Sequence, residues 1–171
     1  MVKTVSLRSA CCVLFAAVLL GLFALLASRA TARANSFDAA QASDPWSSSQ
    51  TVLPNALAKE LGSPDSAKKP TVVCVGFHTL YEGAHIPGAA FHGPGSTPRG
   101  IAEIKTWAKD LPRSANIVLY CGCCPLERCP NLKPAFAAMR DLGFTNLRVL
   151  LLTHDFNADW IEKGYPVEKG K

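Results

Sequence analysis

The sequence predicts an α/β protein in which a central, mostly parallel sheet is flanked by helices on both faces. Three short apolar runs, at residues 71–75, 116–120 and 146–152, have the composition of buried parallel strands. Segments with the apolar spacing or the capping residues of helices separate these runs. Strands that alternate with helices are typical of a parallel sheet. Ligands bind such sheets at the carboxyl ends of the strands, so we expect the functional site there.

The expected helices lie at residues 53–61, 101–111, 131–142 and 156–163. Asn131 is of the residue type that caps a helix N-terminus, and Gly143 is a suitable residue to follow the helix end. The Gly- and Pro-containing stretch between residues 76 and 100 is expected to form turns and loops.

The N-terminus, residues 1–34, is expected to be a signal peptide or an N-terminal membrane anchor. Lys3 and Arg8 precede an uninterrupted apolar run at 10–27, and small residues around Ala32 fit a cleavage site. The apolar run just reaches the length that spans a bilayer, so membrane attachment through residues 10–27 is the alternative to cleavage. Both interpretations predict an exported protein that is periplasmic, secreted or anchored to the membrane.

The rest of the chain divides into a polar linker at 35–51, one domain at 52–168 and a tail at 169–171. The formal net charge is +5, but the first 34 residues hold four of the 18 basic side chains and none of the 13 acidic ones. The remaining 14 basic side chains nearly balance the acidic ones. This leaves no basic field for nucleic acid, and we exclude that class of partner.

Four cysteines lie within nine residues, at positions 121, 123, 124 and 129. The loop that holds them runs from a predicted strand to a predicted helix, where backbone N–H groups and the helix dipole stabilise an anion. We expect the first of them, Cys121, to be a nucleophilic thiolate with a lowered pKa, and Arg128 to add a positive charge. Of the other three cysteines, Cys11 and Cys12 lie in the apolar run at 10–27, whereas Cys74 lies in the middle of a predicted strand and is expected to be a buried free thiol.

Four stretches of this chain resemble single-domain rhodanese-like proteins of the sulfurtransferase type. They are VVCVGFHTLYEGAHIPGA at 72–89, IVLYC at 117–121, LGFTNLRVL at 142–150 and DWIEKGYPV at 159–167. The resemblance implies the rhodanese fold and covalent catalysis by Cys121 without a cofactor. Cys121 would take sulfane sulfur from a small donor such as thiosulfate, carry it as a persulfide, and pass it to a thiol acceptor.

Arg128 and Gly122 are the expected donor-binding residues, and no metal is assigned. The chain departs from the family at several places, two of which bear directly on the active-site loop. Cys74-Val75-Gly76 stands where Asp-Val-Arg is usual, and the active-site loop is about five residues longer. Cys123, Cys124 and Cys129 fill this extension, where we expect them to form a disulfide or to relay the sulfur.

Two alternatives remain open from the residues alone. Cys121 and Cys124 form a C-x-x-C pair, which is typical of thiol–disulfide exchange. The four loop thiols also suit a soft ion such as Cu(I) or Zn, although their spacing is not a standard zinc pattern. A phosphatase of the same fold needs five residues between its cysteine and arginine, and neither Cys121 nor Cys123 has this spacing to Arg128.

Two further side chains are given structural roles. His85 is expected to be a turn residue near the site, because no catalytic partner for it is evident. Trp160 is expected to anchor the last helix in the core.

Overall fold

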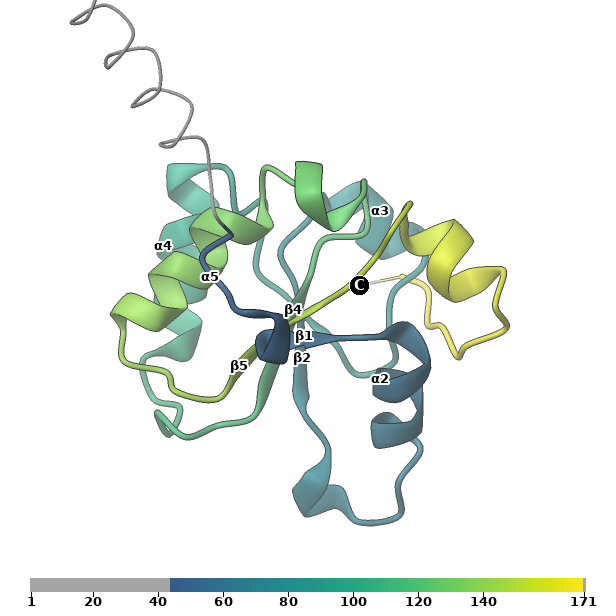
Figure 1. The fold of residues 1–171 in the computed structure, drawn as a ribbon. Helices are drawn as coiled ribbons and strands as arrows, with labels where there is room; N and C mark the ends of the chain where they lie inside the picture. The colour runs from purple at the N-terminus through teal and green to yellow at the C-terminus, as the bar shows by residue number, and fades with distance from the viewer. Residues whose placement is uncertain (1–43, 171) are drawn as a thin grey trace, which may run out of the picture. The chain divides into compact units, whose positions relative to one another are not determined.

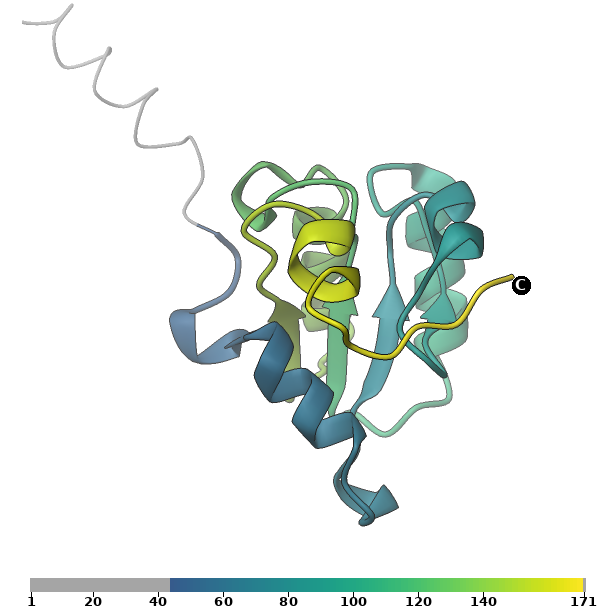
Figure 2. The ribbon, with the colours of Figure 1, turned by 90° about the vertical axis from the view of Figure 1, so that its right-hand side faces the viewer.

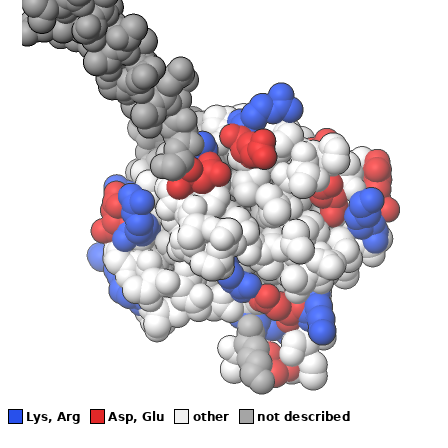
Figure 3. Space-filling view, in the orientation of Figure 1, with Lys and Arg blue, Asp and Glu red and all other residues white. Residues whose placement is uncertain are grey.

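The computed structural model describes residues 44–170, so the predicted signal peptide or anchor lies outside the described residues (Figure 1). None of the helices formed by the described residues has the length and apolar content that a membrane crossing requires. On the face that Figure 3 shows, basic and acidic side chains lie side by side around the edge. This distribution agrees with the nearly balanced charge expected for the domain.

Five strands form one sheet in the order β1-β5-β4-β2-β3, and every pair is parallel. The strands are β1 (Thr51–Val52), β2 (Thr71–Cys74), β3 (Ala90–Phe91), β4 (Ile117–Tyr120) and β5 (Leu147–Leu150). The strand arrows visible in Figure 2 point toward the same edge of the sheet. The predicted α/β class with a parallel sheet is confirmed.

Helices cover both faces of the sheet (Figure 1). Because strand side chains alternate between faces, Val73 and Val75 lie in one core, and Val72 and Cys74 lie in the other. The helices α4 (Pro98–Ala108) and α5 (Leu132–Asp141) contribute to the first core. The second core is covered by α2 (Pro54–Leu61), α3 (His78–Gly83) and a π-helical turn at Asn157–Ile161.

The boundaries of the longer helices follow local capping. Helix α4 begins three residues before its expected start, because Pro98 occupies the first turn and the Thr97 hydroxyl accepts a hydrogen bond from the Gly100 N–H. After α5, Gly143 has a φ of +88°, as its predicted place beyond the helix end requires. Residues 44–170 also form three short 3₁₀ turns, at Ser48–Gln50, Ser66–Lys68 and Leu126–Arg128.

The folded domain begins before residue 52, which corrects the end of the predicted linker. Trp46 is 8% exposed and packs edge-on against Phe136, with ring centroids 5.4 Å apart. Asp44 forms a 3.0 Å ion pair with Lys133. Composition alone suggested a linker here, because a single tryptophan in a polar stretch gives no periodic signal.

Candidate functional site

Cys121 directly follows β4, a strand buried at the centre of the sheet between β5 and β2. Only 2% of this cysteine is exposed. Gly76, which follows β2, approaches it so closely that a Cβ there would collide with the Cys121 carbonyl and lie 3.2 Å from its Sγ. The glycine that replaces the family's usual arginine therefore makes room for Cys121.

The loop after Cys121 is attached to the chain segment that follows β5. Gly122 has a φ of +84°, and a Cβ at this position would press on Phe156 at 3.0 Å. The Phe156 N–H donates a hydrogen bond to the Gly122 carbonyl at 3.1 Å, and the Leu126 N–H donates to the Leu152 carbonyl at 2.8 Å. These two backbone bonds hold the long loop against the sheet edge.

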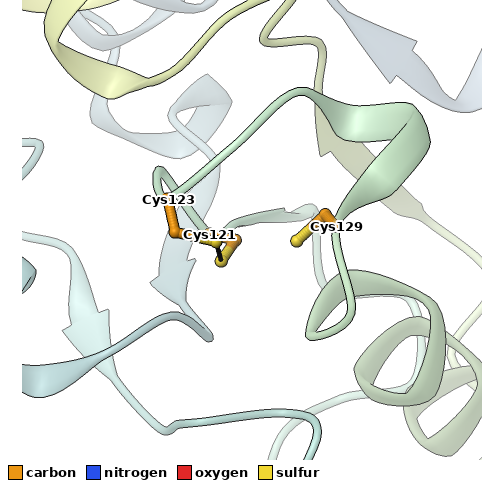
Figure 4. A group of neighbouring side chains, drawn as sticks. All are labelled: Cys121, Cys123 and Cys129. Carbon is orange, nitrogen blue, oxygen red and sulfur yellow. Dashed lines mark hydrogen bonds between the residues drawn. The ribbon is translucent and has the colours of Figure 1, made fainter.

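The sulfur atoms of the loop form a cluster of free thiols. The Sγ atoms of Cys121 and Cys123 are 3.2 Å apart, and those of Cys123 and Cys124 are 3.1 Å apart. Cys129 joins from the far end of the loop, so that the sulfurs of Cys121, Cys123 and Cys129 lie within 4.8 Å of one another. Figure 4 shows the Cys129 side chain pointing toward the other two. Cys121 thus contacts Cys123, and Cys124 contacts Cys123 in turn.

Asn131 belongs to the site, which the sequence did not predict. It is fully buried, and its side chain does not cap α5 as expected. Its Nδ2 donates a hydrogen bond to Cys121 Sγ at 3.2 Å, while its Oδ1 accepts one from the Ser96 N–H at 3.0 Å. Because Ser96 is 35 residues away, no local sequence signal reveals this role.

The negative charge of the cluster is best stabilised on Cys129. Interaction with the Cys121 thiol and hydrogen bonds from the backbone N–H groups of Asn131 and Leu132, at the start of α5, lower the pKa of Cys129 in spite of its burial. Cys129 therefore has the environment that the sequence predicted for Cys121.

Three other thiols, Cys121, Cys124 and Cys74, have raised pKa values, which favour the neutral form. Interaction with Cys129, followed by burial, raises the pKa of Cys121, so the expected lowering at this position is wrong. Burial and interaction with Cys123 raise the pKa of Cys124 to about 12. Burial likewise raises the pKa of Cys74 to about 11, and this buried free thiol lies as expected in β2, 3.9 Å from the Cys121 carbonyl.

A pocket of about 400 Å³ opens at Cys121, with a mostly apolar lining. Its wall includes Leu80, which is 48% exposed, and Phe156. Among the described residues that line it, Asp155 is the one charged side chain. Gly122 lines this pocket, as its expected role requires, whereas the exposed Arg128 lies on the 3₁₀ turn at Leu126–Arg128 and is not among the lining residues.

The two side chains expected to be structural are both buried. His85 is 4% exposed, stacks on Tyr81 with centroids 3.8 Å apart, and has its Nδ1 2.8 Å from the Tyr81 carbonyl oxygen. Trp160 is fully buried, and its Nε1 donates a hydrogen bond to the Pro166 carbonyl at 2.8 Å. These contacts agree with a turn residue and with a core anchor.

Solved structures of rhodanese-like proteins share this architecture. The BH2092 protein of Bacillus halodurans is similar with a TM-score of 0.55 and 23% identity, over 71% of this chain and 77% of that one. The Alr3790 protein of an Anabaena species is similar with a TM-score of 0.52 and 22% identity, over 69% and 82% of the two chains.

A third similar structure is SseA of Escherichia coli, described as a 3-mercaptopyruvate sulfotransferase of the rhodanese fold. Its TM-score is 0.50 with 17% identity, over 71% of this chain and 52% of SseA. No family model matches the sequence, and no curated protein matches it. The chain has a rhodanese-like fold, and its cysteine cluster lies at the carboxyl end of the central strand β4.

Proposed function

We propose that this protein is an exported sulfurtransferase that carries sulfane sulfur as a persulfide on Cys121. The observation that carries the proposal is the position of Cys121. It lies at the carboxyl end of the central strand, lines an open pocket, and has a second thiol of lowered pKa within 4.8 Å. A nucleophile next to a base is the arrangement that covalent catalysis needs.

Cys129 is the proposed base. Its thiolate takes the proton of the Cys121 thiol, and Cys121 becomes the thiolate that attacks the donor. Asn131 stabilises this second thiolate, because its Nδ2–H already points at Cys121 Sγ. The proton thus stays within the cluster during the attack.

Sulfur transfer then proceeds in two displacements. The Cys121 thiolate attacks the sulfane sulfur of the donor, a new S–S bond forms, and the rest of the donor leaves with the electron pair of the broken bond. In the second step an acceptor thiolate attacks the outer sulfur of the persulfide. The acceptor then carries the sulfur, and Cys121 leaves as a thiolate. No outside oxidant or reductant is needed in either step.

The pocket favours an organic sulfane donor over thiosulfate. Thiosulfate carries two negative charges, and moving it from water into an apolar pocket beside Asp155 is costly without a basic partner. The donor expected here has an apolar body that contacts Leu80 and Phe156 and presents its sulfane sulfur to Cys121. We therefore propose this donor in place of thiosulfate. Contacts with Leu80 and Phe156 take the place of the contact with Arg128 that was expected from the sequence.

Mass spectrometry of the reduced protein, before and after treatment with an alkanethiosulfonate, tests this function. We expect a gain of one sulfur atom, mapped to the peptide with Cys121, and its loss on addition of a thiol acceptor. The Cys121→Ser variant is expected to gain no sulfur, whereas Cys74→Ala keeps the gain. A protein whose Cys121 gains no sulfur from the alkanethiosulfonate refutes the proposal.

Export is proposed from residues 1–34 and is tested separately. The mass of the protein recovered from fractionated bacterial cells distinguishes a cleaved chain from a full-length chain in the membrane fraction. Recovery of the full-length chain from the soluble cytoplasmic fraction alone would refute export.

A further inference from the structure

We infer that the sulfurs of Cys121, Cys123 and Cys129 form a three-coordinate site for Cu(I). Metal binding does not depend on the proposed sulfur transfer. One consequence, that bound Cu(I) blocks persulfide formation, does rest on it.

The geometry of the cluster is the first support for the site. Cys121 and Cys123 come from the start of the loop and Cys129 from its end, and the three sulfurs face a common space (Figure 4). A metal–sulfur distance of about 2.3 Å places three sulfurs of a trigonal site about 4 Å apart. The observed sulfur–sulfur separations are 3.2 Å for Cys121 and Cys123 and at most 4.8 Å for the other two pairs. Small side-chain rotations would bring all three separations to about 4 Å.

The chemistry of the ligands favours Cu(I) over other ions. Among the described residues, this group consists of three thiols and contains no His, Asp or Glu. Sites made only of sulfur ligands select soft ions. Structural zinc takes four ligands in a tetrahedron, whereas the fourth thiol here, Cys124, lies outside the group. Cys121 and Cys129 are each 2% exposed, so two of the three ligands are largely shielded from solvent.

The surroundings of the cluster compensate the charge of the bound thiolates. Three thiolates and one Cu(I) have a net charge of −2, and the protons of the neutral thiols leave to solvent on binding. Asn131 Nδ2 donates to Cys121 Sγ at 3.2 Å, and Asn131 is itself held in place by the hydrogen bond from the Ser96 N–H to its Oδ1. Outer hydrogen bonds of this kind orient metal ligands and strengthen binding.

Titration of the reduced, oxygen-free protein with Cu(I) against the coloured chelator bicinchoninate tests the site. We expect one Cu(I) per chain to be taken from the chelator. Cys129→Ser is expected to weaken binding by about 100-fold or more, since loss of an outer partner alone costs about 10–100-fold. Cys123→Ser, at a partly exposed position, repeats the test with less risk to the fold, and Cys74→Ala is the matched cysteine control with unchanged affinity.

Each outcome of the titration decides the inference. Failure to take Cu(I) from the chelator, equal weakening by Cys74→Ala and Cys129→Ser, or stoichiometric binding of Zn but not Cu(I) would overturn it. The persulfide assay separates the two proposals. Persulfide formation without Cu(I) binding removes the metal site alone, and Cu(I) binding without persulfide formation removes the sulfurtransferase alone.

Discussion

The apolar pocket at Cys121 predicts that sulfur transfer becomes faster as the donor's alkyl chain grows. Alkanethiosulfonates from methyl to pentyl share one reacting group and one negative charge, so the series varies the apolar body alone. Attack by Cys121 forms its persulfide and releases the alkanesulfinate. A fully buried methylene contributes about 0.8 kcal/mol. Because Leu80 in the pocket wall is 48% exposed, we take about half of this for each methylene.

An increment of about 0.4 kcal/mol corresponds to about a twofold rise in kcat/KM for each added methylene. The assay measures sulfinate release with a thiol acceptor in excess. Leu80→Ala shortens the apolar wall and is expected to reduce this dependence on chain length. Leu53→Ala is the matched control, because Leu53 is 53% exposed and does not line this pocket. Rates that are flat along the series, or thiosulfate as the fastest donor, would show that the pocket does not select apolar donors.

Three further predictions concern the fold around the site. Trp46→Ala is expected to lower the free energy of unfolding, measured in urea, by about 3 kcal/mol, because this side chain is almost fully buried. A loss below about 0.5 kcal/mol would show that Trp46 does not contribute to the stability of the core. The bidentate bond from Arg148 lowers the pKa of Glu60, so this pair stabilises the fold above the unfolded pKa of about 4.5, and the gain is lost as the pH falls through the folded pKa. Glu60→Gln should therefore lower stability near neutral pH and reduce its acid dependence in urea titrations, and an unchanged pH profile would contradict this. Gly76→Ala is expected to abolish persulfide formation and to destabilise the fold, because the new Cβ collides with the backbone at the start of the cysteine loop. Gly83→Ala is the control, since a Cβ at Gly83 meets no atom within 4 Å. Equal effects of the two variants in both assays would refute the argument.

Local sequence signals predicted those parts of the fold that are long and periodic. The runs that became β2, β4 and β5 carry apolar side chains on both faces, and α4 and α5 carry an amphipathic spacing. The two-residue strands β1 and β3 were not predicted. They exist through pairing with β5 and β2, which is a tertiary contact that composition does not encode.

The same limit applies to the site. The rule that ligands bind at the carboxyl ends of parallel strands predicts a site at Cys121. It could not show that backbone N–H groups at the start of α5 would lower the pKa of Cys129, eight residues further on. That effect depends on the path of the inserted loop. The bond between Asn131 and Cys121 likewise required the packing of a helix against a strand end.

The two backbone bonds that attach the cysteine loop make its assembly depend on a segment that follows it in the chain. Their partners, Leu152 and Phe156, come 23 and 27 residues after Cys129. A chain interrupted before Leu152 would already contain every cysteine of the cluster but would lack both partners that hold the loop in place. The thiols are therefore positioned only after the segment from Leu152 to Phe156 has been synthesised, and this segment, which contributes no sulfur, determines when the cluster takes its shape.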